Sequence, residues 1–481
     1  MIKNDLITIV GTEYVSDDLA IIEKYSKDRS FLQARTPNYV TEPKSTEEVQ
    51  EIVKLANKNK IPVVPISSGI HFYGATLPDQ GGIVVDMRRM NRILKVDNRN
   101  RAVRIEPGVT WGQLQDEVAK HDLGVLNPLL PHATKSALSS SLEREPMLVP
   151  KTEYGEPILT MEVVLPTGEI FRTGSAAVGP PNEIQTDLVG PYGPGLDFFR
   201  LFQGAQGTLG IVSWINVKAP IISKIEKFFF IPFRKIESIV EPLFTIQRRM
   251  LGSECLVLNN FNLASILAEN WPDDFEVLKE LLPPFTLILC LAGGNRLPEG
   301  KVAYEEDDLR DICQEFGIEP IDNLPGVVNL GELMPELLRQ PWKKEPYWKE
   351  RHKGRCADIF FYTTLDRVPE FTRTVYEQAT EYGYSARELG IYVQPIERAR
   401  ACYLEYNFPW NPHASGDQER IIKLHREISL HLLNLGAFFT RPYGPWSGMV
   451  YSRNATFTTT LKGLKEIFDP NHIMNPGKLC L

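Results

Sequence analysis

The chain has 481 residues, of which 43% are hydrophobic and 24% are charged, and its formal net charge is −8 at pH 7. This length exceeds what one hydrophobic core usually supports, so we expect a globular protein of two or more domains. The negative charge disfavours nucleic acid or an anionic membrane as the main partner.

The targeting and redox signals of the sequence are weak. No run of apolar residues approaches the length of about 18 that a membrane span needs, and the first residues contain no apolar core of signal-peptide length. The six cysteines are scattered without C-x-x-C spacing, and the eight histidines are dispersed. We therefore expect no disulfide framework, no metal site and no membrane span, in a cytoplasmic protein.

The first half of the chain predicts short strands separated by helices. Helix starts are indicated where Ser45 precedes Glu48 and where Thr110 precedes Gln113, because these pairs are typical of a capping box. The pair of strands at residues 161–165 and 169–172 is predicted to be a hairpin. Further strands are predicted at residues 62–66, 82–86, 102–106 and 211–217.

The pattern changes after Pro220 to longer mixed elements. Strands are predicted at residues 227–231, 285–291 and 359–363, and helices at residues 368–382 and 417–433. This order indicates an α+β layer with an antiparallel sheet. Residues 180–194 are rich in Gly, Pro and Asn and predict a loop.

Residues 65–74, with the sequence PISSGIHFYG, join two predicted buried strands. A loop of small residues can direct several backbone N–H groups at one point and bind an anion without a lysine. The alternative is an ordinary turn with two glycines. The chain contains neither a G-x-G-x-x-G fingerprint nor a P-loop, so no motif supports a nicotinamide or nucleoside-triphosphate site.

This loop resembles the pyrophosphate loop of the vanillyl-alcohol-oxidase and p-cresol-methylhydroxylase family, whose phenol-oxidising members show P-I-S-x-G-x-N-x-x-Y-G. Other segments match that family in the same order along the chain. They are EPKSTEEV at residues 42–49, VVDM…MNRI at residues 84–93, IEPGVT at residues 105–110, QGAQGTLGIV at residues 203–212 and FDPNHIMNPGK at residues 468–478.

The resemblance implies an α+β fold of two domains. Residues 1–222 would form a PCMH-type FAD-binding domain, residues 223–435 an inserted cap with an antiparallel sheet, and residues 436–481 a segment that returns to the FAD-binding domain. FAD would accept hydride at its N5 atom. The residues that the resemblance implies for FAD binding are Ile66, Ser67, Ser68, Gly69, Ile70, His71, Gly74, Pro131, Ser136, Ser140, Gly207, Gly210, Ile211, Val212, Asn475 and Lys478.

The resemblance also implies three catalytic residues. Tyr73 and Arg441 would stabilise a phenolate oxygen, and Glu156 would act as a general base toward water that adds to a quinone methide. The alternatives are a packing aromatic for Tyr73, a surface residue for Arg441 and a solvated loop acid for Glu156.

The chain departs from the family at several positions. Phe439 and Thr440 stand where a second phenolate-binding tyrosine would precede the arginine, although Tyr443 is near. His71 replaces an asparagine, and it would contact the flavin or substrate, or only bond to the backbone.

The cap also lacks a clear residue for covalent attachment of the flavin. The nearest candidates are His352, Cys356 and Tyr362, and none is in clear register with the family's attachment residue. The predicted FAD is therefore non-covalent.

These observations predict an FAD-dependent dehydrogenase that oxidises a para-substituted phenol or an aromatic alcohol. Two alternatives stay open: a 2-hydroxy-acid dehydrogenase of the D-lactate or glycolate kind, in which Arg441 or Arg398 would bind a carboxylate, and a flavin subunit that only relays electrons. The expected partners are a small organic substrate and an acceptor protein, such as an electron-transferring flavoprotein, a cytochrome or an iron–sulfur subunit. A homo-oligomer is compatible with the sequence.

Overall fold

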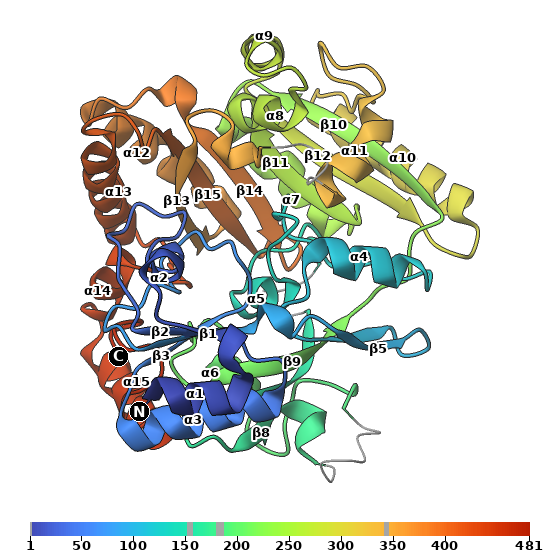
Figure 1. The fold of residues 1–481 in the computed structure, drawn as a ribbon. Coiled ribbons are helices and arrows are strands. Elements are labelled where there is room, and N and C mark those ends of the chain that lie inside the picture. The colour runs from blue at the N-terminus through green and yellow to red at the C-terminus, as the bar shows by residue number, and fades with distance from the viewer. Residues whose placement is uncertain (1, 152–156, 179–186, 341–345) are drawn as a thin grey trace.

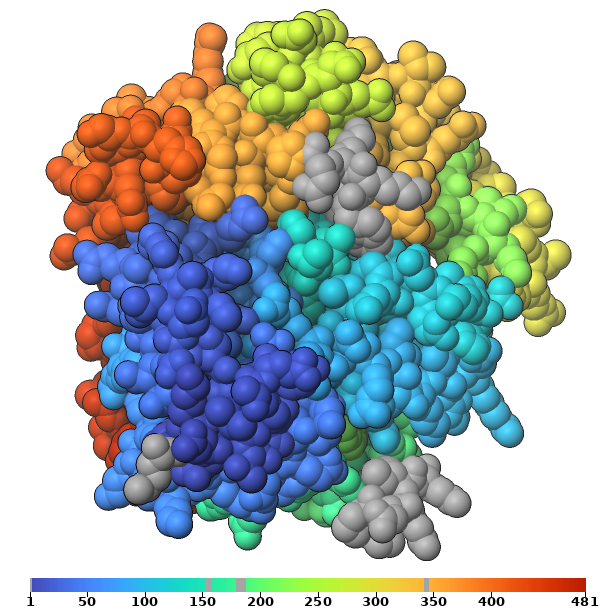
Figure 2. All heavy atoms as spheres, in the orientation of Figure 1, coloured from blue at the N-terminus to red at the C-terminus, as the bar shows by residue number. Residues whose placement is uncertain are grey.

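The computed structural model describes residues 2–151, 157–178, 187–340 and 346–481. Figure 1 shows a lower part, built from the blue, cyan and green segments, and an upper part that contains a large sheet. The red C-terminal segment runs down from the upper part and ends beside the N-terminal segment. In Figure 2 the orange atoms of the upper part rest directly on blue and cyan atoms of the lower part. None of the helices in the described residues combines the length and apolar character that a bilayer crossing requires.

The first sheet of the lower part has the strand order β1-β2-β4-β3. Its strands are β1 (Val15–Ser16), β2 (Tyr39–Thr41), β3 (Val63–Ile66) and β4 (Ile83–Asp86), and β4 pairs in parallel with both β2 and β3. The helices beside it are α1 (Ile2–Val10), α2 (Leu19–Lys24) and α3 (Thr46–Asn59). Ser45 caps α3 as predicted, but Glu48 accepts the N–H of Lys44 at 2.8 Å, so only half of that capping box forms.

The second sheet of the lower part is antiparallel, with the order β5-β6-β9-β7-β8. Its strands are β5 (Ile93–Asp97), β6 (Ala102–Ile105), β7 (Ile158–Val164), β8 (Ile170–Arg172) and β9 (Ile211–Lys218). The predicted hairpin is the pair β7–β8, and the full capping box of Thr110 and Gln113 begins α4 (Trp111–Ala119). The shorter helices of this region are α5 (Ala137–Leu142) and α6 (Phe199–Phe202).

The upper part is the cap, and its six-stranded sheet has the order β10-β12-β11-β14-β15-β13 with every pair antiparallel. The strands are β10 (Ile225–Phe233), β11 (Glu254–Asn259), β12 (Phe285–Gly293), β13 (Arg355–Thr363), β14 (Gly390–Ile396) and β15 (Ala401–Trp410). Its helices are α7 (Val240–Arg248), α8 (Asn260–Leu267), α9 (Asp273–Leu281), α10 (Pro298–Glu315), α11 (Leu330–Arg339), α12 (Val368–Glu381) and α13 (Asp417–Asn434). The sequence analysis predicted β10, β12 and β13. It did not predict β11, β14 and β15, which lie between β12 and β13 in the sheet.

The C-terminal segment completes the lower part. After α14 (Pro445–Tyr451) and α15 (Ala455–Phe468), the chain returns to the edge of the first sheet beside β3. The N–H of Val63 donates to the carbonyl of Ile473 at 2.7 Å, and the N–H of Asn475 donates to the carbonyl of Val63 at 2.8 Å. Ile473 and Met474 are buried in the core beneath this sheet. Both ends of the chain therefore build one part, and the cap is inserted between them.

A buried ion pair holds this returning segment. Lys465 and Asp469 are each 1% exposed and lie 2.7 Å apart. The Lys465 ammonium also donates to the carbonyls of Thr208 and Met474, and the Asp469 carboxylate accepts the N–H groups of Ile473 and Met474.

We expect Asp469→Ala to destabilise the protein by about 3–5 kcal/mol, because it leaves the Lys465 charge buried without its partner. Urea unfolding followed by fluorescence measures the change. Asp17→Ala, which breaks an exposed pair with Lys3, is the matched control and should leave the unfolding midpoint nearly unchanged. Equal effects of the two substitutions would show that the buried pair does not hold the returning segment.

Candidate active site

The loop after β3 and the turn before β9 face each other across a cavity that we call the glycine-lined pocket. Its walls carry little side-chain bulk, because they include Ser67, Ala75, Gly204, Gly207 and Gly210. The remaining lining residues are Pro65, His71, Thr76, Met87, Leu138, Ser139, Leu142, Glu143, Phe202, Ala205, Gln206, Ile211, Val212 and Tyr443.

The loop after β3 carries backbone N–H groups without an acceptor in the described part of the protein. Within the described residues, no N–H group from Ser68 to Tyr73 donates a hydrogen bond to the protein, whereas the next N–H, of Gly74, donates to Asp28 at 2.6 Å. Partly buried N–H groups need an acceptor, and a run of them can bind an anion. The described lining residues include no lysine or arginine, so backbone amides would carry the attraction for a pyrophosphate.

Close packing explains the glycines opposite this loop. Gly207 has a φ of +74°, and a Cβ atom there would lie 2.5 Å from Cγ of Pro65. At Gly210 a Cβ atom would lie 2.7 Å from Cγ1 of Val163. Asn475 donates to the carbonyls of Ala75 at 2.9 Å and Gln206 at 2.6 Å, which holds the two walls together. A narrow cleft with small walls and free amides fits the dinucleotide FAD.

The loop residues implied for FAD have different positions in the structure. Ser67 and His71 line the glycine-lined pocket. The His71 ring bonds through Nε2 to the carbonyl of Ser68, and burial lowers the pKa of His71, so its ring is neutral. His71 is thus both bonded to the backbone and exposed to the pocket. The other implied residues of this loop do not line the glycine-lined pocket; they are Ile66, Ser68, Gly69, Ile70 and Gly74.

The other residues implied for FAD fall into two groups. Gly207, Gly210, Ile211 and Val212 line the glycine-lined pocket. The others lie elsewhere. Ser136 caps α5, the Ser140 hydroxyl accepts the indole N–H of Trp111 at 3.1 Å, and Pro131 lines a second cavity described below. Asn475 bridges the walls of the glycine-lined pocket, and Lys478 pairs with Asp79 at 2.7 Å.

A second cavity adjoins the first, and we call it the aromatic pocket. Tyr73 lines it and stacks at 5.2 Å on Tyr443, which lines the glycine-lined pocket. Its aromatic lining residues are Phe72, Tyr73, Tyr347, Trp348, Tyr392 and Tyr403. Its ionisable lining residues, apart from tyrosines, are His132, Lys135, Glu145, Lys349, Asp358, Glu405 and Arg441.

Arg441 reaches the aromatic pocket from the segment between α13 and α14, and it is only 2% exposed. Its guanidinium lies 4.1 Å from the ring centre of Phe360, and Nη2 donates to the Tyr403 hydroxyl at 3.1 Å. Among the described residues, no carboxylate lies within 4.0 Å of it, and Nε has no hydrogen-bond partner. A buried arginine remains charged, so this side chain attracts an anionic ligand.

Strand β15 contributes polar side chains that the sequence analysis missed. Tyr403, Glu405 and Asn407 alternate along the strand, so they share one face. The Tyr403 hydroxyl donates to Glu405, and the Asn407 amide donates to Glu405 at 2.7 Å. Burial, followed by the charge of Glu405, raises the pKa of Tyr403 far above its usual value, so its hydroxyl keeps its proton. A tyrosine hydroxyl therefore lies beside Arg441, although no tyrosine directly precedes Arg441 in the sequence.

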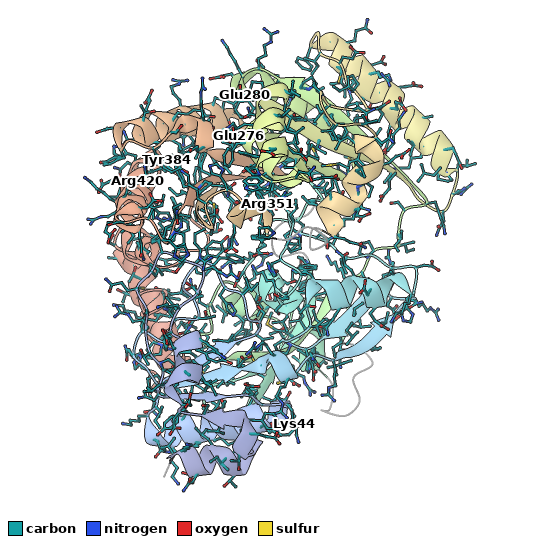
Figure 3. The ribbon with its side chains drawn as sticks, turned by 45° about the horizontal axis from the view of Figure 1, so that its top comes forward. Lys44, Glu276, Glu280, Arg351, Tyr384 and Arg420 are labelled. Carbon is teal, nitrogen blue, oxygen red and sulfur yellow. The ribbon has the colours of Figure 1, made fainter. Side chains whose placement is uncertain are left out.

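Lys349 joins this face to β13. It lies in the short helix η6 (Trp348–Glu350), and its ammonium is 2.7 Å from Asp358 and 2.5 Å from Glu405. Arg351 follows Lys349 by two positions and is labelled beneath the upper helices in Figure 3. Its guanidinium donates to the carbonyls of Ser265 and Ala268 at the end of α8. These bonds fix η6 to the cap and thereby fix the position of Lys349.

Tyr73 is tied to the same cluster. Its hydroxyl donates to Asp358 at 3.2 Å, and burial and then the Asp358 charge raise the pKa of Tyr73 well above its usual value. The structure therefore brings Tyr73 and Arg441 to one pocket, as the resemblance implied. Glu156, the third implied catalytic residue, lies outside the described residues.

The segment around α5 adds another buried charge. The Lys135 ammonium contacts the carboxylate of Glu145 and lies 3.3 Å from that of Glu143. Glu143 lines the glycine-lined pocket, whereas Lys135 and Glu145 line the aromatic pocket. The ion pair thus stands at the boundary between the two cavities.

None of the three candidates for flavin attachment lines the glycine-lined pocket. His352 packs against the rings of Phe261 and Phe275, and Tyr362 is buried in the cap core. Cys356 donates through its sulfur to Asp358 at 3.3 Å.

Comparison with known proteins agrees with this geometry. A family model described as an FAD binding domain matches residues 37–174. The glycolate oxidase subunit GlcD of Bacillus subtilis (strain 168) is 29% identical over 99% of this chain and 96% of its own. The 4-cresol dehydrogenase [hydroxylating] flavoprotein subunit of Pseudomonas putida is 35% identical over 41% of this chain and 38% of its own.

Solved structures show the same fold over the whole chain. A substrate-bound p-cresol methylhydroxylase superimposes with a TM-score of 0.85 at 18% identity, covering 100% of this chain and 96% of the other. The 4-ethylphenol oxidase from Gulosibacter chungangensis superimposes with a TM-score of 0.84 at 19% identity, covering 99% and 96%. The chain is an FAD-linked oxidoreductase, and it has the fold of p-cresol methylhydroxylase. FAD is its cofactor, and the fold expected from the resemblance is confirmed.

In this FAD-linked oxidoreductase, Gly207→Ala should weaken FAD binding about tenfold. The positive φ and the contact with Pro65 make a side chain there cost about 1–3 kcal/mol of strain in the pocket wall. Flavin fluorescence during titration of the apoprotein measures the dissociation constant. Gly463→Ala, at a helical position with no atom within 4 Å of the added Cβ, is the control, and the prediction fails if both variants bind FAD equally.

Proposed function

We propose that this FAD-linked oxidoreductase oxidises a para-substituted phenol or a related aromatic alcohol at the carbon attached to the ring. The observation that supports the proposal most is the environment of Arg441. This buried guanidinium has no carboxylate partner among the described residues, and it lines a pocket with aromatic walls. The rings can stack on a planar substrate, and the guanidinium can hold its ionised oxygen.

In this proposal the protein supplies binding and charge. Bound FAD would accept a hydride from the substrate. Arg441 and the hydroxyl groups of Tyr403 and Tyr73 would surround the phenolic oxygen and stabilise it as an anion, which makes hydride loss from the benzylic carbon easier. Glu156 remains the predicted general base for water addition to the resulting quinone methide.

Oxidation of a 2-hydroxy acid is the second candidate. Relatives that match nearly the full length include a D-lactate dehydrogenase of Anaerostipes hadrus, at 24% identity over 98% of this chain, besides the glycolate oxidase subunit. Arg441 would bind a carboxylate as well as a phenolate. Arg398, the other arginine considered for that role, lines a separate cavity with Glu226 and Glu254, so it does not assist Arg441. The six aromatic side chains have no evident role in binding so small an acid.

The electron acceptor is proposed to be an external protein. The full-length match to an oxidase subunit and the partial match to a flavoprotein subunit support a chain that works with partners. A subunit that only relays electrons would bind FAD but would not be reduced by any small donor.

Anaerobic mixing with substrates tests the proposal. We expect 4-alkylphenols to bleach the flavin absorbance of the purified FAD-loaded protein, and glycolate and D-lactate to leave it unchanged. Arg441→Ala should slow bleaching by about 10²–10³-fold, the cost of one lost charge-stabilising donor. Arg400→Ala, which removes an exposed arginine paired with Glu397, is the control and should bleach at the normal rate. Bleaching by the hydroxy acids alone would overturn the proposal.

We also propose that FAD is bound without a covalent link, because none of the candidate attachment residues lines the glycine-lined pocket. Acid precipitation of the purified protein should give a colourless pellet and a yellow supernatant. A pellet that stays yellow after washing would contradict the proposal.

A further inference from the structure

Four of the charged side chains around the aromatic pocket form one connected network. The carboxylates of Asp358 and Glu405 share the Lys349 ammonium, and Glu405 connects through Tyr403 to Arg441. With all four groups ionised, two positive and two negative charges balance. Arg441 attracts a phenolate, but the phenolate would bring the net charge of these four groups and the ligand to −1 in a buried site, which is costly.

The cost disappears if the proton of the phenol stays inside the cluster. We propose that Glu405 takes up this proton through Tyr403 when the substrate binds, so that the phenol ionises without exchanging a proton with solvent. The inference rests on the proposed phenol oxidation and adds to it the place where the phenolic proton goes.

The step balances in atoms and charge. The substrate O–H bond breaks and an O–H bond forms on the Tyr403 oxygen, while the Tyr403 proton moves to Oε2 of Glu405. The products are a phenolate, a neutral tyrosine and a neutral carboxyl group, and no electrons are transferred. The geometry permits the transfer, because the Tyr403 hydroxyl already donates to Glu405, accepts from Arg441 and retains a second lone pair for the substrate.

Glu405 is a better acceptor for this proton than Asp358. Asp358 accepts hydrogen bonds from Lys349, Tyr73, Asn407 and Cys356. Burial acts to raise the pKa of Asp358, but these donors, led by Lys349, outweigh it and lower the pKa. The geometry also favours Glu405, because the Tyr403 hydroxyl, which accepts from Arg441, donates to Glu405 and not to Asp358.

Several elements place titratable or charged groups near Glu405. They are Lys349 of η6, Tyr347 before it, Cys356 and Asp358 of β13, Tyr392 of β14, Tyr403 of β15, Tyr73 of the loop after β3, and Arg441 before α14. The raised pKa values of Tyr73, Tyr347, Tyr392 and Tyr403 keep these hydroxyl groups protonated at neutral pH, so Glu405 is the open end of the relay.

The decisive experiment uses the FAD-loaded wild-type protein and 4-chlorophenol, which has no benzylic hydrogen to lose. Its ultraviolet difference spectrum reports whether the bound ligand is a phenolate, and a pH-indicator dye in weak buffer reports protons released. We expect bound phenolate with no proton release. Release of one proton per bound phenolate, or a ligand bound in its neutral form, would overturn the inference.

Substitution of Glu405 extends the test to turnover. In Glu405→Gln the proton must leave to solvent, so binding should release one proton. The rate of anaerobic flavin reduction by 4-ethylphenol should then rise about tenfold per pH unit through the acid range, whereas the wild-type rate stays flat. Tyr403→Phe should show the same pH dependence because it interrupts the relay.

Glu254→Gln is the matched control, since Glu254 is a buried carboxylate on strand β11 of the same sheet and pairs with Arg339 away from the aromatic pocket. It should keep the wild-type pH profile. A flat profile in Glu405→Gln, with phenol still oxidised, would refute the relay and leave the proposed function standing. Failure of every phenol to bind or to reduce the flavin would refute the proposed function, and the relay with it.

Discussion

Burial of ionised side chains between the cap and the FAD-binding part is the constraint on which the active site depends. A buried charge is costly unless a partner or hydrogen bonds compensate it. Lys349, Asp358, Glu405 and Arg441 come from different segments, and the Tyr73 hydroxyl joins them from the FAD-binding part. The buried charges find their partners only when the cap, the loop after β3 and the C-terminal segment are assembled. The contacts that join the two parts therefore also shape the proposed substrate pocket.

The local features of the fold could be predicted from the sequence because their causes are local. Thr110 and Gln113 cap a helix through neighbours three residues apart, and the β7–β8 hairpin is set by the turn between its strands. The glycines of the flavin loops could be recognised because small residues there are required at fixed spacing. Even such local signals can fail in detail. The Glu48 carboxylate accepts the N–H of Lys44 instead of that of the N-cap residue Ser45.

The substrate side could not be predicted to the same depth. Strand β15 is buried on both faces, so its alternation of Tyr403, Glu405 and Asn407 with apolar residues gives no clear contrast between core and solvent. In the family that the chain resembles a tyrosine directly precedes the arginine, but here the hydroxyl beside Arg441 comes from Tyr403, 38 positions away in the chain. Lys349 and Asp358 are nine residues apart, and nothing local indicates that Lys349 also pairs with Glu405. These contacts are set by sheet register and by the docking of η6.

Most residues of the glycine-lined pocket come from the FAD-binding part, whereas the aromatic pocket combines residues of that part, the cap and the C-terminal segment. The FAD binding domain model covers residues 37–174, which supply the loop after β3 and part of the glycine-lined pocket. The polar groups of the aromatic pocket come largely from the cap, through Lys349, Asp358, Tyr403 and Glu405. A fold can carry many chemistries when its cofactor half is retained and its substrate half varies. Likeness of residues 37–174 to an FAD binding domain identifies a flavoenzyme. The proposed choice of a phenol over a hydroxy acid rests on the charges and rings around Arg441, many of which come from the cap.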